Sequence, residues 1–477
     1  MSRKSYEVKQ SDKISNDIEG YLKEQENKSF LRFITCGSVD DGKSTLIGRL
    51  LYDSKLIFED QLQSLENESK KIGTQGGDID FALLVDGLAA EREQGITIDV
   101  AYRFFSTDKR KFIVADTPGH EQYTRNMATG ASSADLAVIL IDARKGILTQ
   151  TRRHSYIVSL LGIKHIVVAI NKMDLMDYSQ NTFNEIEKAY RELANKLDFE
   201  SITCIPLSAL KGDNITEASD SMPWYQGPTL IQHLETIDIS SSREQQPFRL
   251  PVQWVNRPNL DFRGFSGTIA SGSIKPGSEI VSLPSAKTSK VKSITTFDGD
   301  VNEAIADQAI TLTLEDEIDI SRGDVIAELK HRPESTDHFQ AHVIWMHDKP
   351  MLPGRPYLIK TTNKTANGEV TELKYKVNVN TFEHEPGKVL ELNEVGVCNL
   401  SLDSEIVFDA YKNNPALGSF IVIDKLSNAT LAAGMIDFGL RRASNVHWHA
   451  MDVDKGARAE QKRQKPVVLW FTGLSAS

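Results

Sequence analysis

The first chemistry that the sequence suggests lies in a glycine-rich run: Gly37, Ser38, Val39, Asp40, Asp41, Gly42, Lys43 and Ser44, continued by Thr45. The run matches the P-loop pattern and stands between an apolar stretch and an expected helix, Thr45–Leu51. Its two glycines let successive backbone N–H groups face phosphate oxygens at the helix N-terminus. Lys43 supplies positive charge to the β- and γ-phosphates, and Ser44 supplies a hydroxyl ligand for Mg²⁺. Alone, this motif predicts only that some nucleotide binds here.

Two later motifs indicate which base is bound. The first directly follows an expected strand and consists of Asn171, Lys172, Met173 and Asp174. In a base-recognition loop of this kind, the Asp174 carboxylate accepts from the ring N–H and the exocyclic amine of guanine, a donor pair that adenine lacks. Taken alone, Asp174 could equally be a helix N-cap. The second motif follows the expected strand Ile202–Leu207 and fits the loop whose backbone N–H meets the guanine oxygen: Ser208, Ala209 and Leu210.

Two further segments are expected around the γ-phosphate. One ends an expected strand and consists of Asp116, Thr117, Pro118, Gly119 and His120. Asp116 is placed to bind Mg²⁺ through water, and the Gly119 N–H to sense the γ-phosphate. Upstream, Thr97 is the natural second hydroxyl ligand of Mg²⁺ once the γ-phosphate orders its loop. His120 would orient or polarise the attacking water, with a surface-capping histidine as the alternative.

The elements that must position these motifs alternate between apolar strands and amphipathic helices from Ser29 to about Leu234. We expect buried parallel strands at Phe30–Cys36, Lys111–Ala115, Leu136–Asp142 and His165–Asn171. This alternation predicts a mostly parallel sheet with helices on both faces. The predicted α/β P-loop GTPase domain covers residues 29–240 and follows a polar N-terminal extension, residues 1–28.

The sequence pattern changes after a polar linker, Ser240–Gln246. Short β-branched runs then alternate with turn residues in two blocks, as in Gly267–Ser271, Glu279–Leu283, Val291–Thr296, Gln340–Met346, Gly368–Val379 and Phe420–Asp424. Evenly spaced short strands of this kind favour small closed barrels over sandwiches. We therefore expect two small β-barrel domains, residues 241–330 and 331–440.

Composition narrows the class of protein. A net charge of −11 over 477 residues argues against a nucleic-acid binder, which needs clustered Lys and Arg. The sequence contains neither a membrane-spanning apolar stretch nor a secretory signal. Cys36, Cys204 and Cys398 are far apart and odd in number, which favours reduced, buried thiols in a cytoplasmic protein over disulfides or a metal cluster.

Four motifs in this order, each at a strand end, resemble the translation-factor class of GTPases, which includes elongation factor Tu. The run Gly264–Gly277 is similar to the second-domain barrel of these factors. The resemblance implies that His120 is the catalytic histidine, and that Val39 and Ile96 are the apolar pair that gates it. It also implies GTP and Mg²⁺ as ligands.

Longer runs resemble the large, GTPase subunit of bacterial sulfate adenylyltransferase: Asp99–Phe105, Glu121–Gly130, Ala143–His154, Gln253–Asn259 and Phe420–Ile436. This resemblance covers about residues 25 to 440. Gln94 stands where translation factors usually carry arginine. The resemblance implies a separate small subunit that forms adenylyl sulfate from ATP and sulfate, in a heterodimer or a multimer of it. GTP hydrolysis on the large subunit would drive that uphill reaction.

The tail, residues 441–477, reads as a linker followed by a kinase-like start. The apolar run Val467–Phe471 leads into Gly473–Ser477, similar to the first part of the P-loop of adenylyl-sulfate kinase, which some bacteria fuse behind the GTPase subunit. Because it lacks the P-loop lysine, this stub is predicted to be inactive. The alternative is an ordinary C-terminal strand.

The sequence is also compatible with two other functions. A translation-type GTPase that delivers an aminoacyl-tRNA would need a basic groove for RNA, and a non-catalytic GTP-binding scaffold would need His120 to be idle. The charge runs Arg152-Arg153 and Arg441-Arg442 are expected on solvated faces, with a partner interface as the alternative.

Overall fold

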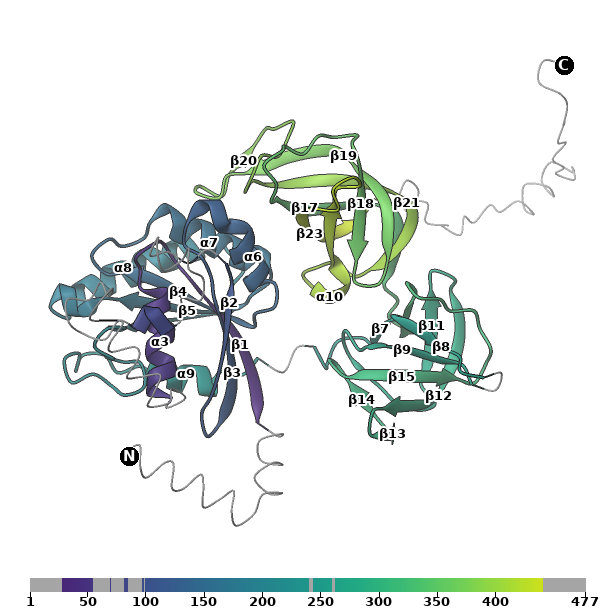
Figure 1. Cartoon of the computed structure of the whole chain (residues 1–477), viewed down its shortest axis with the longest axis horizontal. Helices are drawn as coiled ribbons and strands as arrows, with labels where there is room; N and C mark the ends of the chain where they lie inside the picture. The colour runs from purple at the N-terminus through teal and green to yellow at the C-terminus, as the bar shows by residue number, and fades with distance from the viewer. Residues whose placement is uncertain are drawn as a thin grey trace, which may run out of the picture. The chain divides into compact units, whose positions relative to one another are not determined.

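The computed structural model describes residues 28–54, 69, 81–84, 97, 99–239, 243–259 and 262–440 (Figure 1). Several predictions fall on the rest of the chain and so lie outside the described residues. These are the N-terminal extension, Gln94, the gate residue Ile96, and the kinase-like tail.

A six-stranded sheet forms the framework of the nucleotide-binding domain. Its strands are β1 (Ser29–Cys36), β2 (Ala101–Ser106), β3 (Arg110–Asp116), β4 (Leu136–Asp142), β5 (His165–Asn171) and β6 (Ser201–Pro206). The order is β2-β3-β1-β4-β5-β6, and every pairing is parallel except that of β2 with β3. All seven residues of β4 are buried, as expected for a central parallel strand covered on both faces. The predicted mostly parallel sheet is confirmed.

Helices cover both faces of this sheet, as predicted (Figure 1). One face packs against α3 (Lys43–Asp53) and α9 (Leu230–Thr236). The opposite face packs against α6 (Thr124–Ala131), α7 (Thr149–Leu160) and α8 (Gln180–Ala194). Three short 3₁₀ turns complete the described helical elements of this domain: η1 (Phe81–Leu84), η2 (Glu121–Tyr123) and η3 (Met173–Met176). The motif loops all lie at the carboxyl ends of the strands, where ligands bind in open α/β sheets.

The described part of the first β domain contains ten short strands. They are β7 (Arg249–Pro251), β8 (Trp254–Asn256), β9 (Gly264–Thr268), β10 (Ser273–Ile274), β11 (Glu279–Leu283), β12 (Lys287–Thr296), β13 (Gly299–Val301), β14 (Ala304–Ile305), β15 (Ala309–Leu314) and β16 (Val325–Glu328). The main sheet runs β7-β16-β11-β12-β15-β9-β8. No continuous ladder closes it within the described residues, although an isolated bridge joins Arg249 to Ser271. The predicted bounds Gly267–Ser271 are wrong, because the strand there, β9, begins at Gly264 and ends at Thr268.

The second β domain is a closed barrel. Its elements are β17 (Glu334–Trp345), β18 (Pro356–Thr361), β19 (Thr365–Val377), β20 (His384–Glu385), β21 (Val395–Phe408), α10 (Pro415–Gly418), β22 (Ser419–Ile423) and β23 (Thr430–Gly439). Closure follows because β18 pairs with β22 on one side and with β19 on the other. Aromatic rings such as Phe339, Phe408 and Phe420 fill the interior. A GTP-binding α/β domain followed by two β domains is thereby established, while the predicted domain boundaries stay predictions.

The three cysteines are free and buried, as the sequence predicts. Burial raises the pKa of the Cys36, Cys204 and Cys398 thiols to about 12, so they behave as small apolar side chains. Among the described helices, none has the length and apolar character that crossing a membrane requires.

Candidate functional site

The phosphate loop joins β1 to α3, and its two glycines are required by close packing. Gly42 adopts φ 92° at the N-cap of α3, and a Cβ there would lie 2.5 Å from the Asn171 Nδ2 atom. Gly37 has φ 153°, and its Cβ would lie 2.7 Å from the Leu140 carbonyl oxygen. Any larger residue would push the loop away from β4 and β5, so the glycines keep the backbone N–H groups at the end of the sheet.

Lys43 lies buried at the centre of this loop. Its Nζ donates to the carbonyl oxygens of Ser38 at 2.7 Å and Gly37 at 3.3 Å. Burial lowers the pKa of Lys43, while the nearby Asp116 and Asp41 carboxylates act in the opposite direction. The ammonium group is thus held inside the loop in which a phosphate chain would lie, as its predicted role requires.

Asp41 forms a hydrogen bond within the same loop. Its Oδ2 accepts the Ser38 N–H at 2.6 Å, and its Oδ1 is buried with no hydrogen-bond partner among the described residues. Burial raises the pKa of this carboxyl group. Of the other predicted loop residues, Asp40 is exposed, and Val39 and Thr45 are partly buried.

The structure brings the three predicted magnesium ligands together. The Ser44 hydroxyl donates to Asp116 Oδ2 at 2.8 Å and lies 3.3 Å from the Thr97 hydroxyl. Thr35 holds the other carboxylate oxygen, donating to Asp116 Oδ1 at 3.2 Å. Hydroxyl and carboxylate oxygens are the donor set that Mg²⁺ prefers, so these residues fit the ion.

The loop after β3 passes directly over the phosphate loop. A Cβ on Gly119 would lie 2.6 Å from Lys43 Nζ and 2.8 Å from the Gly37 carbonyl oxygen. The next residue, His120, is exposed and caps η2, its Nδ1 accepting the Gln122 N–H at 3.3 Å. Capping and catalysis are therefore compatible here, because capping engages only one of the two ring nitrogens.

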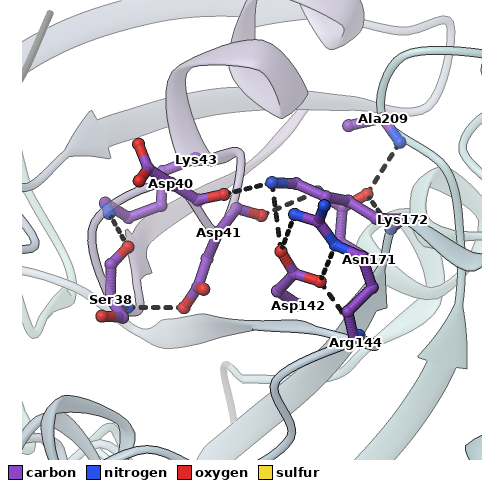
Figure 2. A network of polar contacts seen from close by, with 9 residues as sticks. All are labelled: Ser38, Asp40, Asp41, Lys43, Asp142, Arg144, Asn171, Lys172 and Ala209. Atoms are coloured by element: carbon purple, nitrogen blue, oxygen red, sulfur yellow. Dashed lines mark hydrogen bonds and ion pairs between the residues drawn. The ribbon is translucent and has the colours of Figure 1, made fainter. Parts of the chain in front are cut away.

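The base-recognition motifs form a polar network with the phosphate loop (Figure 2). Asn171 donates to the Asp41 carbonyl at 2.8 Å and accepts the Ala209 N–H at 2.9 Å. The Lys172 ammonium group donates to the carbonyl oxygen of Asp40. Three loops from three strand ends are thereby tied to one another.

Asp174 lies within η3 and is partly exposed. The helix-cap alternative for this residue is wrong, because the cap position of η3 is Lys172. The Met173 N–H donates to the Leu207 carbonyl at 3.3 Å, which joins this turn to the neighbouring loop. That loop is Ser208-Ala209-Leu210, with Ser208 buried and its hydroxyl accepting the Lys211 N–H at 3.2 Å.

Asp142, at the end of β4, is a member of this network that sequence reasoning missed (Figure 2). Its fully buried carboxylate accepts from the Arg144 guanidinium at 2.6 and 3.0 Å and from Lys172 Nζ at 3.2 Å. Burial opposes ionisation, but the hydrogen bonds from Arg144 and the Lys172 charge outweigh it and lower the pKa of Asp142 to about 2. A charged residue closing a seven-residue apolar strand was the available signal.

His154, on α7, is a second missed residue. Its Nδ1 accepts the N–H of Gly37, the first residue of the phosphate loop, at 3.1 Å. Arg153 beside it was expected on a solvated face, but it is buried and paired with Glu121 at 2.9 Å. No motif marks either residue, because only the packing of α7 on the sheet brings them to these loops.

Three family models match successive parts of this chain. Residues 28–241 match the family model "Elongation factor Tu GTP binding domain", residues 265–327 match "Elongation factor Tu domain 2", and residues 338–437 match "GTP-eEF1A C-terminal domain-like". Among solved structures, that of sup35 complexed with GDP covers 87% of this chain and 95% of its own, at 23% identity and a TM-score of 0.40.

Curated relatives are much more similar. "Sulfate adenylyltransferase subunit 1" of Saccharophagus degradans is 55% identical over 94% of this chain and 99% of its own length. The protein of the same name from Chromobacterium violaceum is 60% identical over 90% of both chains. "Bifunctional enzyme NodQ" of Rhizobium sp. strain N33 is 59% identical over 97% of this chain and 72% of its own length. This chain therefore belongs to the family of GTPase subunits of sulfate adenylyltransferase, built on elongation factor Tu-like domains.

Proposed function

We propose that this chain hydrolyses GTP at the site built by the phosphate loop, Asp116–His120, and the two base-recognition loops, and that this hydrolysis drives the formation of adenylyl sulfate. The observation that carries the proposal is the network through Asn171 and Lys172, which ties the phosphate loop to the two loops that we assign to base recognition. Family membership supplies the reaction: sulfate activation with a GTPase subunit.

Guanine selectivity is assigned to Asp174 and to the loop Ser208–Leu210. The carboxylate accepts from two guanine donors, and adenine would leave it unpaired. In the described structure the Ala209 N–H is bonded to Asn171 Oδ1, so bound guanine would compete with that contact or share it. Replacing Asp174 with asparagine turns an acceptor into a mixed donor and acceptor, which suits xanthine better than guanine.

Ser44, Thr97 and Asp116 would hold Mg²⁺, with Asp116 acting through water. The ion would neutralise charge on the β- and γ-phosphates. The residues of the chain do the rest. Lys43 adds a fixed positive charge, the Gly119 N–H faces the γ-phosphate, and His120 orients the attacking water with the ring nitrogen that does not cap η2.

The partner is the small subunit that transfers the adenylyl group from ATP to sulfate, in a heterodimer or a multimer of it. Joining sulfate to AMP forms a high-energy anhydride, so accumulation of product requires coupled hydrolysis. Loops that change with the γ-phosphate supply the coupling if the partner binds the GTP and GDP states differently.

Co-expression with the small subunit tests the coupling. We expect ATP and sulfate together to stimulate GTP hydrolysis, and adenylyl sulfate to accumulate only with GTP. GTP turnover that ignores ATP, sulfate and the small subunit would contradict the coupling while leaving the GTPase assignment intact.

Variants of the site test the assignment of roles. His120→Ala is expected to leave GTP affinity within about twofold and to lower turnover by about 10²-fold or more. Lys43→Ala is expected to weaken GTP binding itself, because a buried charge partner of the phosphates is lost. Unchanged turnover in the first variant would favour a non-catalytic scaffold, and unchanged binding in the second would overturn the phosphate site.

A further inference from the structure

Consecutive residues of α7 hold the two loops that must cooperate in hydrolysis. His154 reaches the phosphate loop, where its Nδ1 accepts the Gly37 N–H at 3.1 Å. Its ring is buried, so this N–H has the imidazole as its partner in place of water. Burial, helped by the charges of Lys43 and Arg153, lowers the pKa of His154 to about 3. The ring is therefore neutral at physiological pH, with the proton on Nε2 and a lone pair on Nδ1 for Gly37.

Arg153 reaches the other loop. Its guanidinium lies 2.9 Å from the carboxylate of Glu121, the residue that follows His120. The Arg153 side chain is 10% exposed and that of Glu121 57%, so the arginine is fixed by packing and the glutamate is drawn to it. Glu121 opens η2, the turn whose N-terminus His120 caps, so the ion pair restrains the turn that carries the predicted catalytic ring.

The two loops also touch each other. A Cβ on Gly119 would lie 2.6 Å from Lys43 Nζ and 2.8 Å from the Gly37 carbonyl oxygen, so the two backbones approach each other closely in this structure. Because adjacent residues of α7, Arg153 and His154, contact the two loops, this helix constrains the position of one loop relative to the other. The neighbouring Arg152 lies on the same helix and is partly buried, but its side chain makes no hydrogen bond or ion pair among the described residues.

We propose that Arg153 and His154 are positioning residues for GTP hydrolysis, with His154 fixing the phosphate loop for binding and Arg153 fixing the His120 turn for turnover. This inference rests on the proposed function. It predicts a split between affinity and rate. Loss of the His154 acceptor leaves the buried Gly37 N–H without a partner, which weakens GTP binding. Loss of the Arg153–Glu121 pair leaves binding intact and misplaces the His120 turn, which lowers kcat.

The test combines equilibrium binding of a fluorescent GTP analogue with single-turnover GTP hydrolysis on the full chain. We expect Arg153→Glu and Glu121→Arg each to lower the hydrolysis rate about fivefold or more, with GTP affinity within twofold. The charge-swapped double variant should recover most of the rate. His154→Leu should weaken binding about tenfold, and His154→Asn, which keeps an acceptor near the Nδ1 position, should recover most of the affinity. Arg152→Glu is the matched control and should change neither quantity.

The outcomes are distinguishable from failure of the proposed function. If His120→Ala abolishes hydrolysis while Arg153→Glu and Glu121→Arg retain the wild-type rate, the function stands and the role of Arg153 is wrong. If both single variants lose hydrolysis rate and the charge-swapped double variant does not recover it, loss of the ion pair is not the cause of the slower hydrolysis. The positioning role of Arg153 is then wrong. Should His154→Leu fold poorly, the Asn variant decides: wild-type affinity supports the acceptor role, and affinity lost about tenfold in a folded variant contradicts it.

Discussion

At the scale of single residues, the site combines motif residues with buried charges that no motif contains. Asp142 shows the difference. Its carboxylate holds Lys172 and Arg144, and Lys172 in turn donates to the phosphate loop. Since the pKa of Asp142 is lowered from 3.8 to about 2, the folded state favours the ionised form by about 2 kcal/mol. That stability is present above pH 4 and is lost as the pH falls through 2.

Asp142→Asn is accordingly expected to lower the free energy of unfolding by about 2 kcal/mol at pH 7, with the difference from wild type shrinking as the pH approaches 2. Urea denaturation at a series of pH values measures it. Asp198→Asn is the matched control, because Asp198 is also paired with a lysine, Lys164, but is 81% exposed. Exposed pairs contribute little, so the control should change stability by less than about 1 kcal/mol. Equal losses in both variants would contradict the role of burial at Asp142.

At the scale of elements, the sequence predicted the strands and helices that carry continuous apolar patterns. β4 and β5 were predicted to the residue, since every residue of β4 and all but the first of β5 are buried. β2 was not expected, because it lies at the sheet edge and only Phe105 of its six residues is buried. The motif loops could be predicted from spacing alone, whereas Asp142, Arg153 and His154 could not. Their roles depend on which loops the fold brings beside the end of β4 and the side of α7.

The edge strand β2 offers a stability test at this scale. Phe105 is 3% exposed and stacks on Phe112 at 4.7 Å between ring centroids, whereas Phe104 on the opposite face is 66% exposed. Phe105→Ala should cost about 3–5 kcal/mol in the free energy of unfolding, from lost burial and the cavity left behind. Phe104→Ala should cost less than about 1 kcal/mol. Thermal or urea unfolding of both variants measures the two free energies. Similar losses of stability in Phe105→Ala and Phe104→Ala would mean that β2 packs differently from the arrangement described.

At the scale of the whole molecule, the central question is whether the nucleotide bound here drives chemistry on another subunit. Changing the base specificity separates this coupling from mere assembly. Asp174→Asn is expected to exchange preference for GTP for preference for XTP, without touching the residues around the γ-phosphate. In complex with the small subunit, this variant should accumulate adenylyl sulfate from ATP and sulfate with XTP and not with GTP, and the wild-type complex should do the reverse. Hydrolysis of XTP by the variant complex without accumulation of adenylyl sulfate would show that the nucleotide site turns over on its own. If adenylyl sulfate accumulates with XTP in the variant complex, hydrolysis at this site drives the reaction on the small subunit. The partner could respond to XTP only through this site and the loops that surround it.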